Sequence, residues 1–361
     1  MAAQNHEEVT RVLVTGASGF IATHTVQQLL QAGYKVRGTV RSLNNANKVK
    51  HLKDLCPNAA HELELVEADL LNEQCWASAV QGCSHVLHIA SPFPIESPAD
   101  ENELIKPAVQ GTTSVLQACA DAGTVKRVVL TSSVVAIMDF ASPKTRAHNE
   151  ADWPNVSNLA PYNKSKTLAE KCAWEFMKSL PDDKKFELAV VNPGFVMGPV
   201  LSGSYCSAMT LVKKILTRDP PANVRINFGI VDVRDVAKAH INAMTEPEAV
   251  GRRHILVNKS MWMSDMAEIL KAEFQQHGYN VSTSNLPKFI FKIVAIFDKE
   301  AKEMAPIWNK TFDFDNTRMR QVLKIEPTPI QDTFIDMGYS IIEGGYIQKH
   351  KNYKGRPAAK S

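Results

Sequence analysis

The sequence predicts an α/β fold in which a doubly wound parallel sheet is joined to a smaller, discontinuous C-terminal lobe. Two observations predict the sheet. Short runs rich in Val, Leu and Ile alternate with amphipathic segments as far as Asn192, and the runs are apolar throughout, as in strands covered on both faces. Parallel neighbours need long crossovers, so the alternation favours helices on both sides of one sheet. A third observation predicts the lobe, because the alternation fades after Asn192.

The expected strands and helices follow from local composition. Each strand is a short run rich in β-branched residues, and each helix has apolar residues on one face. Several helices end near a glycine, which stops helices because it easily adopts the left-handed conformation. The expected strands are 11–15, 35–40, 63–67, 85–89, 127–131 and 187–191, and the expected helices are 20–31, 47–55, 72–80, 104–120 and 162–179. Crossovers in such sheets are right-handed, which makes the fold doubly wound.

The second half of the chain is less regular. We expect a helix over 202–214, a loop at 219–221, a return to the large sheet and its helix over 231–244, and a strand over 253–257. Helices and loops dominate from Met263 onward. This organisation predicts three parts: a larger domain of residues 10–193 plus 226–250, a lobe of residues 194–225 plus 251–345, and a disordered basic tail of residues 346–361.

Charge and cysteine usage limit the expected partners. The formal net charge is +3, but residues 344–361 carry five basic residues and no acidic one, which leaves −2 for the rest. A nearly neutral body has no electrostatic footprint for nucleic acid, and the tail is most simply a solvated terminus. The six cysteines form no C-x-x-C pair, no apolar run is long enough to span a bilayer, and residues 1–9 lack an apolar signal core. We therefore expect a cytoplasmic protein with reduced thiols, no metal and no membrane insertion.

A glycine-rich turn, TGASGFIA at 15–22, lies between the first expected strand and helix. Gly16 permits a tight turn, Gly19 lets a ligand approach the backbone, and Ala22 lets helix and strand pack closely. Unpaired N–H groups at a helix N-terminus favour an anion there. In this context the turn predicts a Rossmann-type domain that holds the pyrophosphate of a dinucleotide. The alternative is a strand–helix turn without a ligand.

The end of the second expected strand favours NADP(H) over NAD(H). Sites for NAD(H) place Asp or Glu there to hold the ribose hydroxyls, but this chain has Arg41. A guanidinium pairs with a 2′-phosphate that a carboxylate would repel, and Lys48 in the following helix adds a second charge. The alternative is that both are solvated cations. Asp69, after the third strand, is a candidate partner of the adenine amino group, with Leu70 against the ring, or else a helix N-cap.

Tyr162 and Lys166 are four residues apart at the start of an expected helix, so they share one face. A free tyrosine has a pKa of about 10. A neighbouring ammonium lowers the pKa of the phenol toward neutral pH, where it exchanges protons efficiently. Ser133 follows the fifth strand, at the edge where open α/β sheets bind ligands, and its hydroxyl can bond a carbonyl oxygen. Together the three residues predict acid–base chemistry on a carbonyl group.

Nine motifs carry a family resemblance. They are VTGASGFIA (14–22), VRGTVRS (36–42), EADL (67–70), HIASPF (88–93), KPAVQGT (106–112), KRVVLTSS (126–133), YNKSKTLAEK (162–171), NPGFVMGP (192–199) and VDVRDVAKAH (231–240). Over about residues 10–345 the chain resembles the extended short-chain dehydrogenase/reductases of the NAD-dependent epimerase/dehydratase superfamily. It is most similar to their dihydroflavonol reductase-like branch.

The resemblance implies that Ser133, Tyr162 and Lys166 form a catalytic triad. Tyr162 would be the general acid in reduction, Ser133 would polarise the carbonyl, and Lys166 would also bind the nicotinamide ribose. The resemblance further implies that NADP(H) contacts Gly16, Ala17, Ser18, Gly19, Phe20, Ile21, Arg41, Lys48, Asp69, Leu70, Ala90, Tyr162, Lys166, Pro193 and Val196.

The expected function is NADPH-dependent reduction of aldehydes or ketones, reversible as alcohol oxidation. Flavonoid reductases read flavonoid hydroxyls with an asparagine where this chain has Met138, so we expect a small to medium, largely apolar substrate. One alternative is a hydroxysteroid or sterol dehydrogenase of the same superfamily. Another is a non-enzymatic NADP(H)-sensing protein, although such proteins usually lose the Tyr or Lys. Tyr205 and Met209 are candidate substrate contacts or core residues. A monomer and a homodimer are both compatible with the sequence.

Overall fold

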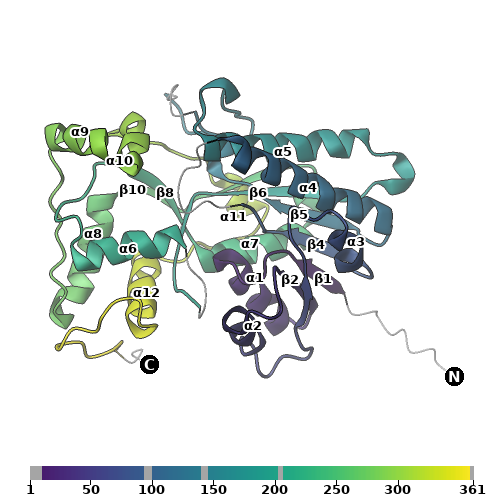
Figure 1. Ribbon diagram of the computed structural model, residues 1–361, viewed down its shortest axis with the longest axis horizontal. Coiled ribbons are helices and arrows are strands. Elements are labelled where there is room, and N and C mark those ends of the chain that lie inside the picture. Colours follow the sequence, from purple (N-terminus) through teal and green to yellow (C-terminus); the bar gives the residue numbers. More distant parts are fainter. Residues whose placement is uncertain (1–9, 93–99, 140–144, 202–205, 358–361) are drawn as a thin grey trace.

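In the computed structural model, which describes residues 10–92, 100–139, 145–201 and 206–357, a large sheet lies between two layers of helices, with a smaller lobe beside it (Figure 1). The strand order is β3-β2-β1-β4-β5-β6-β9, and all neighbouring pairs are parallel. The direction of crossover reverses at β1, which puts a crevice outside the carboxyl ends of β1 and β4. The predicted doubly wound α/β fold is confirmed.

Helices cover both faces of the large sheet. Helices α1 (Phe20–Gln31) and α7 (Val233–Thr245) pack together on one face with α2 (Ala46–Lys53) and α11 (Thr317–Gln321), and α3 (Cys75–Val80), α4 (Asn102–Ala122) and α5 (Pro161–Ser179) cover the other. The strands are β1 (Arg11–Val14), β2 (Lys35–Val40), β3 (Glu64–Glu67), β4 (His85–His88), β5 (Arg127–Thr131), β6 (Glu187–Pro193) and β9 (Arg253–Leu256). The observed bounds of α1, β2 and β5 are those expected from sequence.

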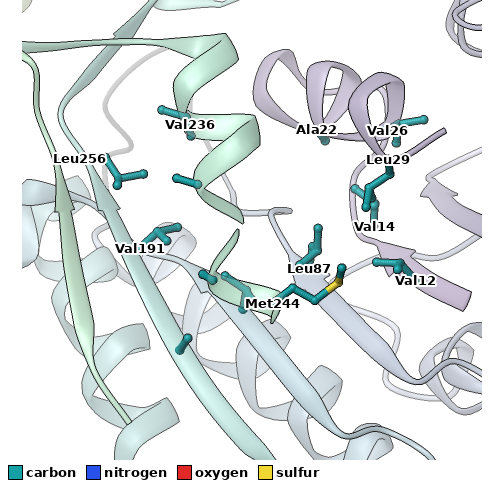
Figure 2. Close-up of a cluster of buried hydrophobic side chains, with 14 of the residues drawn as sticks. Val12, Val14, Ala22, Val26, Leu29, Leu87, Val191, Val236, Met244 and Leu256 are labelled. Carbon is teal, nitrogen blue, oxygen red and sulfur yellow. The ribbon is translucent and has the colours of Figure 1, made fainter. Parts of the chain in front are cut away.

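Alternate residues of one strand belong to two different cores. Val12 and Val14 of β1 lie in the cluster under α1 and α7, whereas Leu13 lies in the cluster under α4 and α5, and all three are fully buried. The strand is therefore apolar at the three consecutive positions 12–14 rather than at every second one. Figure 2 shows the first cluster, to which strands and helices contribute Ala22, Val26, Leu29, Leu87, Val191, Val236, Met244 and Leu256.

The lobe has a small sheet of its own that the sequence did not predict. Strands β7 (Phe195–Met197) and β8 (Asn227–Asp232) are parallel, and β10 (Lys259–Trp262) runs antiparallel to β8. Helices α6, α8 and α12 pack around an apolar core beside it. The lobe helices are α6 (Ser207–Thr217), α8 (Met263–Phe274), α9 (Lys288–Phe297), α10 (Lys299–Met304) and α12 (Ile330–Glu343). Short 3₁₀ segments occupy Val134–Ala136 (η1), Val156–Asn158, Asp182–Lys184, Pro247–Ala249, Gln275–His277 and Ala305–Ile307.

Two segments lie in the opposite sheet from the one expected. Strand β8 was expected to return to the large sheet but lies in the small one, and β9, expected within the lobe, forms the edge of the large sheet beside β6. The boundary placed after residue 250 is therefore wrong for residues 253–256. A close crossing explains the exchange, because a Cβ on Gly194 would lie 2.2 Å from the carbonyl oxygen of Gly229. Only glycine lets the chain leave β6 and pass directly across β8 at this point.

The C-terminal segment packs on the lobe as far as the structure describes it. Ile347 is buried, Arg356 forms an ion pair with Asp336, and the backbone N–H of Lys354 bonds Nδ1 of His277 at 3.3 Å. The expectation of a disordered tail is therefore wrong for residues 346–357, and residues 358–361 lie outside the described part. Apolar residues interleaved with the basic ones, Ile347 and Tyr353, supply the contacts.

Within the described ranges no helix is long and apolar enough to cross a membrane, α9 included, although its Phe289, Ile296 and Phe297 face solvent. All six cysteines are free, and two of them, Cys83 and Cys119, are buried. No cluster of His, Cys, Asp or Glu among the described residues has the arrangement of a metal site.

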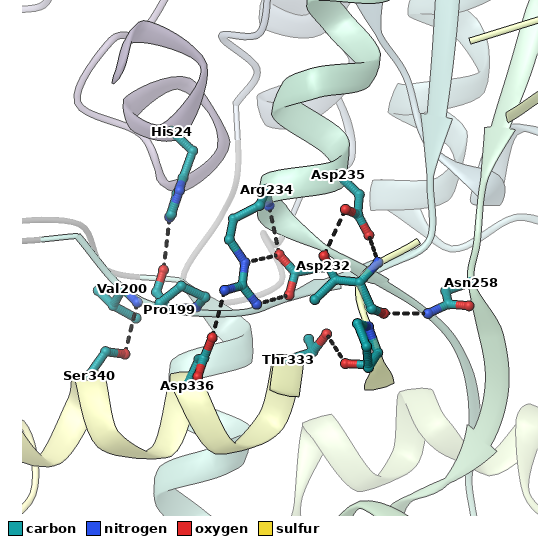
Figure 3. A network of polar contacts seen from close by, with 12 residues as sticks. His24, Pro199, Val200, Asp232, Arg234, Asp235, Asn258, Thr333, Asp336 and Ser340 are labelled. Atoms are coloured by element: carbon teal, nitrogen blue, oxygen red, sulfur yellow. Dashed lines mark hydrogen bonds and ion pairs between the residues drawn. The ribbon is translucent and has the colours of Figure 1, made fainter. Parts of the chain in front are cut away.

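A polar network joins the large domain to the lobe at the start of α7 (Figure 3). Asp232 caps α7 by accepting a hydrogen bond from the Arg234 N–H at 2.8 Å. The Arg234 guanidinium then bridges Asp232 and Asp336 of α12, at 2.7 and 2.6 Å. Beside it, His24 of α1 meets the carbonyl oxygen of Pro199 at 2.8 Å. Because Asp232 and Asp336 are both buried, Arg234 neutralises charges that would otherwise be costly.

We expect Arg234→Met to lower the free energy of unfolding by about 2 kcal/mol or more, because it leaves the buried Asp232 without its cation and leaves the buried Asp336 paired with Arg356 alone. Denaturant unfolding followed by circular dichroism measures this change. The matched control is Lys178→Met, which removes an exposed ion pair with Glu175 and should cost under about 0.5 kcal/mol. Equal losses in the two variants would contradict the role given to Arg234.

Candidate active site

The glycine-rich turn is clamped between the carboxyl ends of β2 and β4. The Gly16 N–H donates to the Thr39 hydroxyl at 2.9 Å, and the Ala17 N–H donates to the Thr39 carbonyl at 2.8 Å. Gly16 has φ +67°, and a Cβ there would lie 3.1 Å from the Cβ of Ala90. Gly19 is the N-cap of α1 and supplies no side-chain cap, so the first-turn N–H groups of the helix point to an open end. This cradle fits the pyrophosphate of a dinucleotide.

The other predicted cofactor residues lie along the same edge of the sheet. Arg41 is exposed immediately after β2, and Ala90 follows β4 with its N–H donated to the Thr15 hydroxyl at 2.9 Å. Pro193 ends β6, and Val196 lies in β7 just beyond it. The side chain of Lys48 lies outside the described residues.

Asp69 does not cap a helix. It follows β3, and its Oδ1 accepts a hydrogen bond from the Leu71 N–H at 2.9 Å, but α3 begins only at Cys75 with Gln74 at its N-cap. The N-cap alternative is therefore wrong, and the adenine contact stays a prediction. Leu70 packs against α4, where a Cβ on Gly111 would lie 2.8 Å from a Leu70 methyl group.

Ser133, Tyr162 and Lys166 lie at the carboxyl ends of β5 and β6. Ser133 caps η1, and its Oγ accepts from the Val135 N–H at 3.3 Å and donates to the Pro193 carbonyl at 3.5 Å. Tyr162 is the second residue of α5 and is half-buried. Lys166, one turn later and buried, donates from Nζ to the Thr131 carbonyl at 3.3 Å. Helix α5 thus brings the phenol and the ammonium to the strand end that carries Ser133.

Burial controls the protonation of the phenol and the ammonium. It raises the pKa of Tyr162 to about 12. It lowers the pKa of Lys166 to about 8, while the charge of Glu170 acts in the opposite direction. In the protein alone, burial therefore shifts the pKa of Tyr162 upward, in the opposite direction from the lowering that the sequence predicted. Tyr162 is a neutral phenol, the form that donates a proton, throughout the physiological pH range.

A cavity of about 10 Å³ lies next to the Lys166 side chain. Its lining includes His88 from β4, Thr112 from α4, and Ser132 beyond β5. It has room for about one water molecule. Helix α4 and strand β4 therefore meet α5 around this cavity.

Of the two residues that were candidates for substrate contact or core packing, Met209 is a core residue. Met209 is 2% exposed and belongs to the apolar core of the lobe. Tyr205 lies outside the described residues. Met138 is also buried, in a small cluster with Ile137 and Ile255 beneath the Ser133 loop.

Behind the predicted triad lies a buried ion pair that the sequence did not predict. Glu170, fully buried in α5, accepts from the Arg253 Nε at 2.5 Å, and its other oxygen accepts from the Ser132 hydroxyl at 2.5 Å and from the Asn192 amide at 2.9 Å. The sequence held one indication of a role for Glu170: it follows Lys166 by four residues and so lies on the same face of the helix. Arg253 had no comparable signal, since it starts a short strand far along the chain.

The chain is similar to known reductases along most of its length. Residues 12–257 match the model of the NAD dependent epimerase/dehydratase family. A cinnamoyl-CoA reductase of Medicago truncatula is 41% identical over 72% of this chain and 79% of its own. The bifunctional dihydroflavonol 4-reductase/flavanone 4-reductase of Malus domestica is 36% identical over 76% and 79%. The crystal structure of yeast methylglyoxal/isovaleraldehyde reductase Gre2 complexed with NADPH has a TM-score of 0.78 at 29% identity, over 93% of this chain and 99% of that one.

These matches confirm NADP(H) as the cofactor, which the sequence favoured through Arg41. The assignments of individual residues to the cofactor and to the triad stay predictions.

Gly16→Ala should weaken NADPH binding at least about tenfold, because the new methyl group meets Ala90 and the left-handed backbone strains the turn. Titration of NADPH fluorescence measures the dissociation constant. Gly33→Ala is the matched control, since Gly33 also has a positive φ, +82°, but nothing lies within 4 Å of the position that its new Cβ would take. The control should lose stability by about 1 kcal/mol and keep its affinity. Unchanged affinity in Gly16→Ala would remove the turn from the cofactor site.

Proposed function

The chain belongs to the NAD dependent epimerase/dehydratase family and is an NADP-dependent oxidoreductase of its dihydroflavonol reductase-like branch, and we propose that it reduces aldehydes and ketones. The reaction is reversible as alcohol oxidation. The observation that supports the proposal is that Ser133 and Lys166 both lie at the carboxyl end of β5, with Tyr162 one turn before Lys166 in α5. Reductase names among the relatives support it.

Residues along the sheet edge would hold the cofactor, which when bound supplies the hydride. Residues 16–21 would bind the pyrophosphate, Arg41 the 2′-phosphate, and Asp69 and Leu70 the adenine. Ala90, Pro193 and Val196 would contact the nicotinamide half, and Lys166 its ribose. The exposed position of Arg41, directly after β2, supports the phosphate contact because a solvated guanidinium loses little on pairing with a dianion.

Tyr162 donates the proton that the carbonyl oxygen needs as its carbon is reduced. Its phenol is protonated at neutral pH, since its pKa is about 12. As the proton leaves, the Lys166 ammonium stabilises the developing phenolate. A pKa of about 8 keeps most of Lys166 charged at neutral pH. In the reverse direction the same phenolate accepts the alcohol proton.

Ser133 orients the carbonyl group. Its hydroxyl hydrogen bond to the Pro193 carbonyl, at 3.5 Å, is at the limit of useful geometry. Redirecting that hydroxyl to a substrate oxygen therefore costs little. Met138 stands where flavonoid reductases have asparagine, and because it is buried with Ile137 and Ile255 it offers no hydrogen bond to flavonoid hydroxyls, which supports a small to medium, largely apolar substrate over a polyphenol.

Tyr162→Phe should lower kcat at least about 100-fold, because it removes the proton donor and little else. NADPH consumption with aldehydes, diketones, dihydroflavonols and ketosteroids measures kcat, and NADPH fluorescence should show a dissociation constant within about twofold of wild type. Turnover retained in this variant would exclude Tyr162 as the donor. Fast turnover of ketosteroids alone would replace the general carbonyl reductase with a hydroxysteroid dehydrogenase.

Arg41→Asp should weaken NADPH binding at least about 100-fold while changing NADH binding far less, because a carboxylate repels only the 2′-phosphate. Both affinities are measured by fluorescence titration. Arg320→Asp makes the same charge change on α11, which packs against β9 at the other end of the strand order, and should leave both affinities unchanged. An equal loss for NADPH and NADH in Arg41→Asp would disprove the phosphate contact.

A further inference from the structure

We propose that Glu170 is a positioning residue for this reaction, holding the Ser133 loop and Lys166 in one arrangement through its ion pair with Arg253. The inference rests on the proposed function for the roles of Ser133 and Lys166. It concerns a residue outside the Tyr-x-x-x-Lys motif, with its carboxylate behind the site rather than in contact with a substrate.

The ion pair is rigid because every part of it is held. Arg253 donates from Nε and Nη2 to the two oxygens of Glu170, at 2.5 and 3.2 Å, a forked geometry that fixes both groups. Its remaining donors bond the carbonyls of Glu150 (3.1 Å), Asp152 (2.7 Å) and Ala136 (2.8 Å). The ring of Trp153 covers the guanidinium at 3.8 Å. Arg253 therefore anchors Glu170 to the edge strand β9.

Glu170 fixes the backbone on both sides of the Ser133 hydroxyl. Its carboxylate accepts from the hydroxyl of Ser132 at 2.5 Å and from the Asn192 amide at 2.9 Å. The same amide also bonds the Ser133 carbonyl, at 3.2 Å. Arg253 meanwhile holds the Ala136 carbonyl at the far end of η1, which Ser133 caps. The loop that aims Ser133 is thus tied at three points to one buried ion pair.

Glu170 also acts on Lys166, one turn earlier in α5. Its negative charge favours the ammonium, against the burial that disfavours it. The other titratable group beside Lys166 in the lining of the small cavity is His88 of β4, which burial keeps neutral with a pKa of about 3. On the far side of Glu170, Arg253 of β9 forms the ion pair, and Glu150, from the segment before the 3₁₀ turn at Val156–Asn158, pairs with Arg318 at 3.9 Å. Among the described residues, Glu170 is therefore the carboxylate that supports a charged Lys166.

If Glu170 only supported the fold, apolar side chains could replace the ion pair equally well. A buried ion pair seldom stabilises a fold more than well-packed apolar side chains do. The experiment must therefore separate support of the fold from support of the triad. We choose Glu170→Gln, which keeps the shape and removes the charge, and Glu170→Gln/Arg253→Gln, which removes both charges. Ser132→Ala cuts one bond between Glu170 and the Ser133 loop and creates no unpaired buried charge.

Two readouts are combined. The first is kcat and KM on the best carbonyl substrate. The second needs no turnover: trace acetic anhydride labels lysines in proportion to their neutral fraction, and mass spectrometry of Lys166 across pH gives its labelling midpoint. Thermal unfolding is recorded alongside. Asp336→Asn, which breaks the lobe ion pairs, is the control for general destabilisation.

For Glu170→Gln we expect kcat to fall at least about tenfold with KM changed less than about threefold, and the Lys166 midpoint to move about one pH unit lower. The double variant should be more stable to heat than Glu170→Gln. Its kcat and its Lys166 labelling midpoint should stay as low as those of Glu170→Gln. Ser132→Ala should lower kcat several-fold, about fivefold, with the midpoint unchanged. Asp336→Asn should lose stability with the midpoint of wild type.

Wild-type kcat and a wild-type midpoint in the double variant would overturn the proposal, because Glu170 would then serve only to neutralise Arg253. A wild-type kcat in Ser132→Ala would count against it even if the other two variants failed to fold. A wild-type protein that reduces no carbonyl compound would refute the proposed reaction instead, and the Lys166 midpoints would still decide whether Glu170 supports the ammonium.

Discussion

The common direction of the seven strands determines where every functional group of this protein lies. The inner strands are buried on both faces, so the chain must leave the sheet, cross a face as a helix and return to the same edge. Polar groups that meet a ligand cannot lie on the faces and gather where the strands end. The glycine-rich turn follows β1, Arg41 follows β2, and Ser133 follows β5. Helix α5 then needs only its first two turns to add Tyr162 and Lys166.

The wall behind that edge is polar but almost neutral. His88 of β4 bonds the Thr15 hydroxyl at 2.9 Å, and His240 of α7 bonds the Thr131 hydroxyl at 2.6 Å. Burial lowers the pKa of both rings to about 3 and about 4, so neither is charged at neutral pH. Charge is confined to Lys166 and to the pair of Glu170 and Arg253. Because Glu170 offsets the charge of Arg253, the Lys166 ammonium acts on Tyr162 from a wall whose other groups are neutral and hydrogen-bonded.

Local patterns account for what could be predicted from sequence, and distant contacts account for what could not. Buried strands, amphipathic helices and the spacing of Tyr162 and Lys166 are visible within a few residues. For this reason the fold class, the glycine-rich turn and the cofactor could be predicted from the sequence. Strands β7 and β10, of three and four residues, are too short to show a period. The sheet to which β8 belongs depends on Gly194 crossing Gly229. The partner of Glu170 lies 83 residues away along the chain, and no local signal connects the two.

The place of β9 at the edge of the large sheet also determines when the sheet can be completed during synthesis. The ribosome delivers β1 to β6 and α5 well before β9, which emerges only after β7, α6, β8 and α7. During that interval β6 has an open edge, a template for mispairing with other chains, and the Glu170 carboxylate lacks its cation. The nucleotide-binding half cannot mature as an independent N-terminal unit, as domains commonly do. A chain cut after α7 would keep every residue of the proposed triad and still lack the strand that closes its sheet.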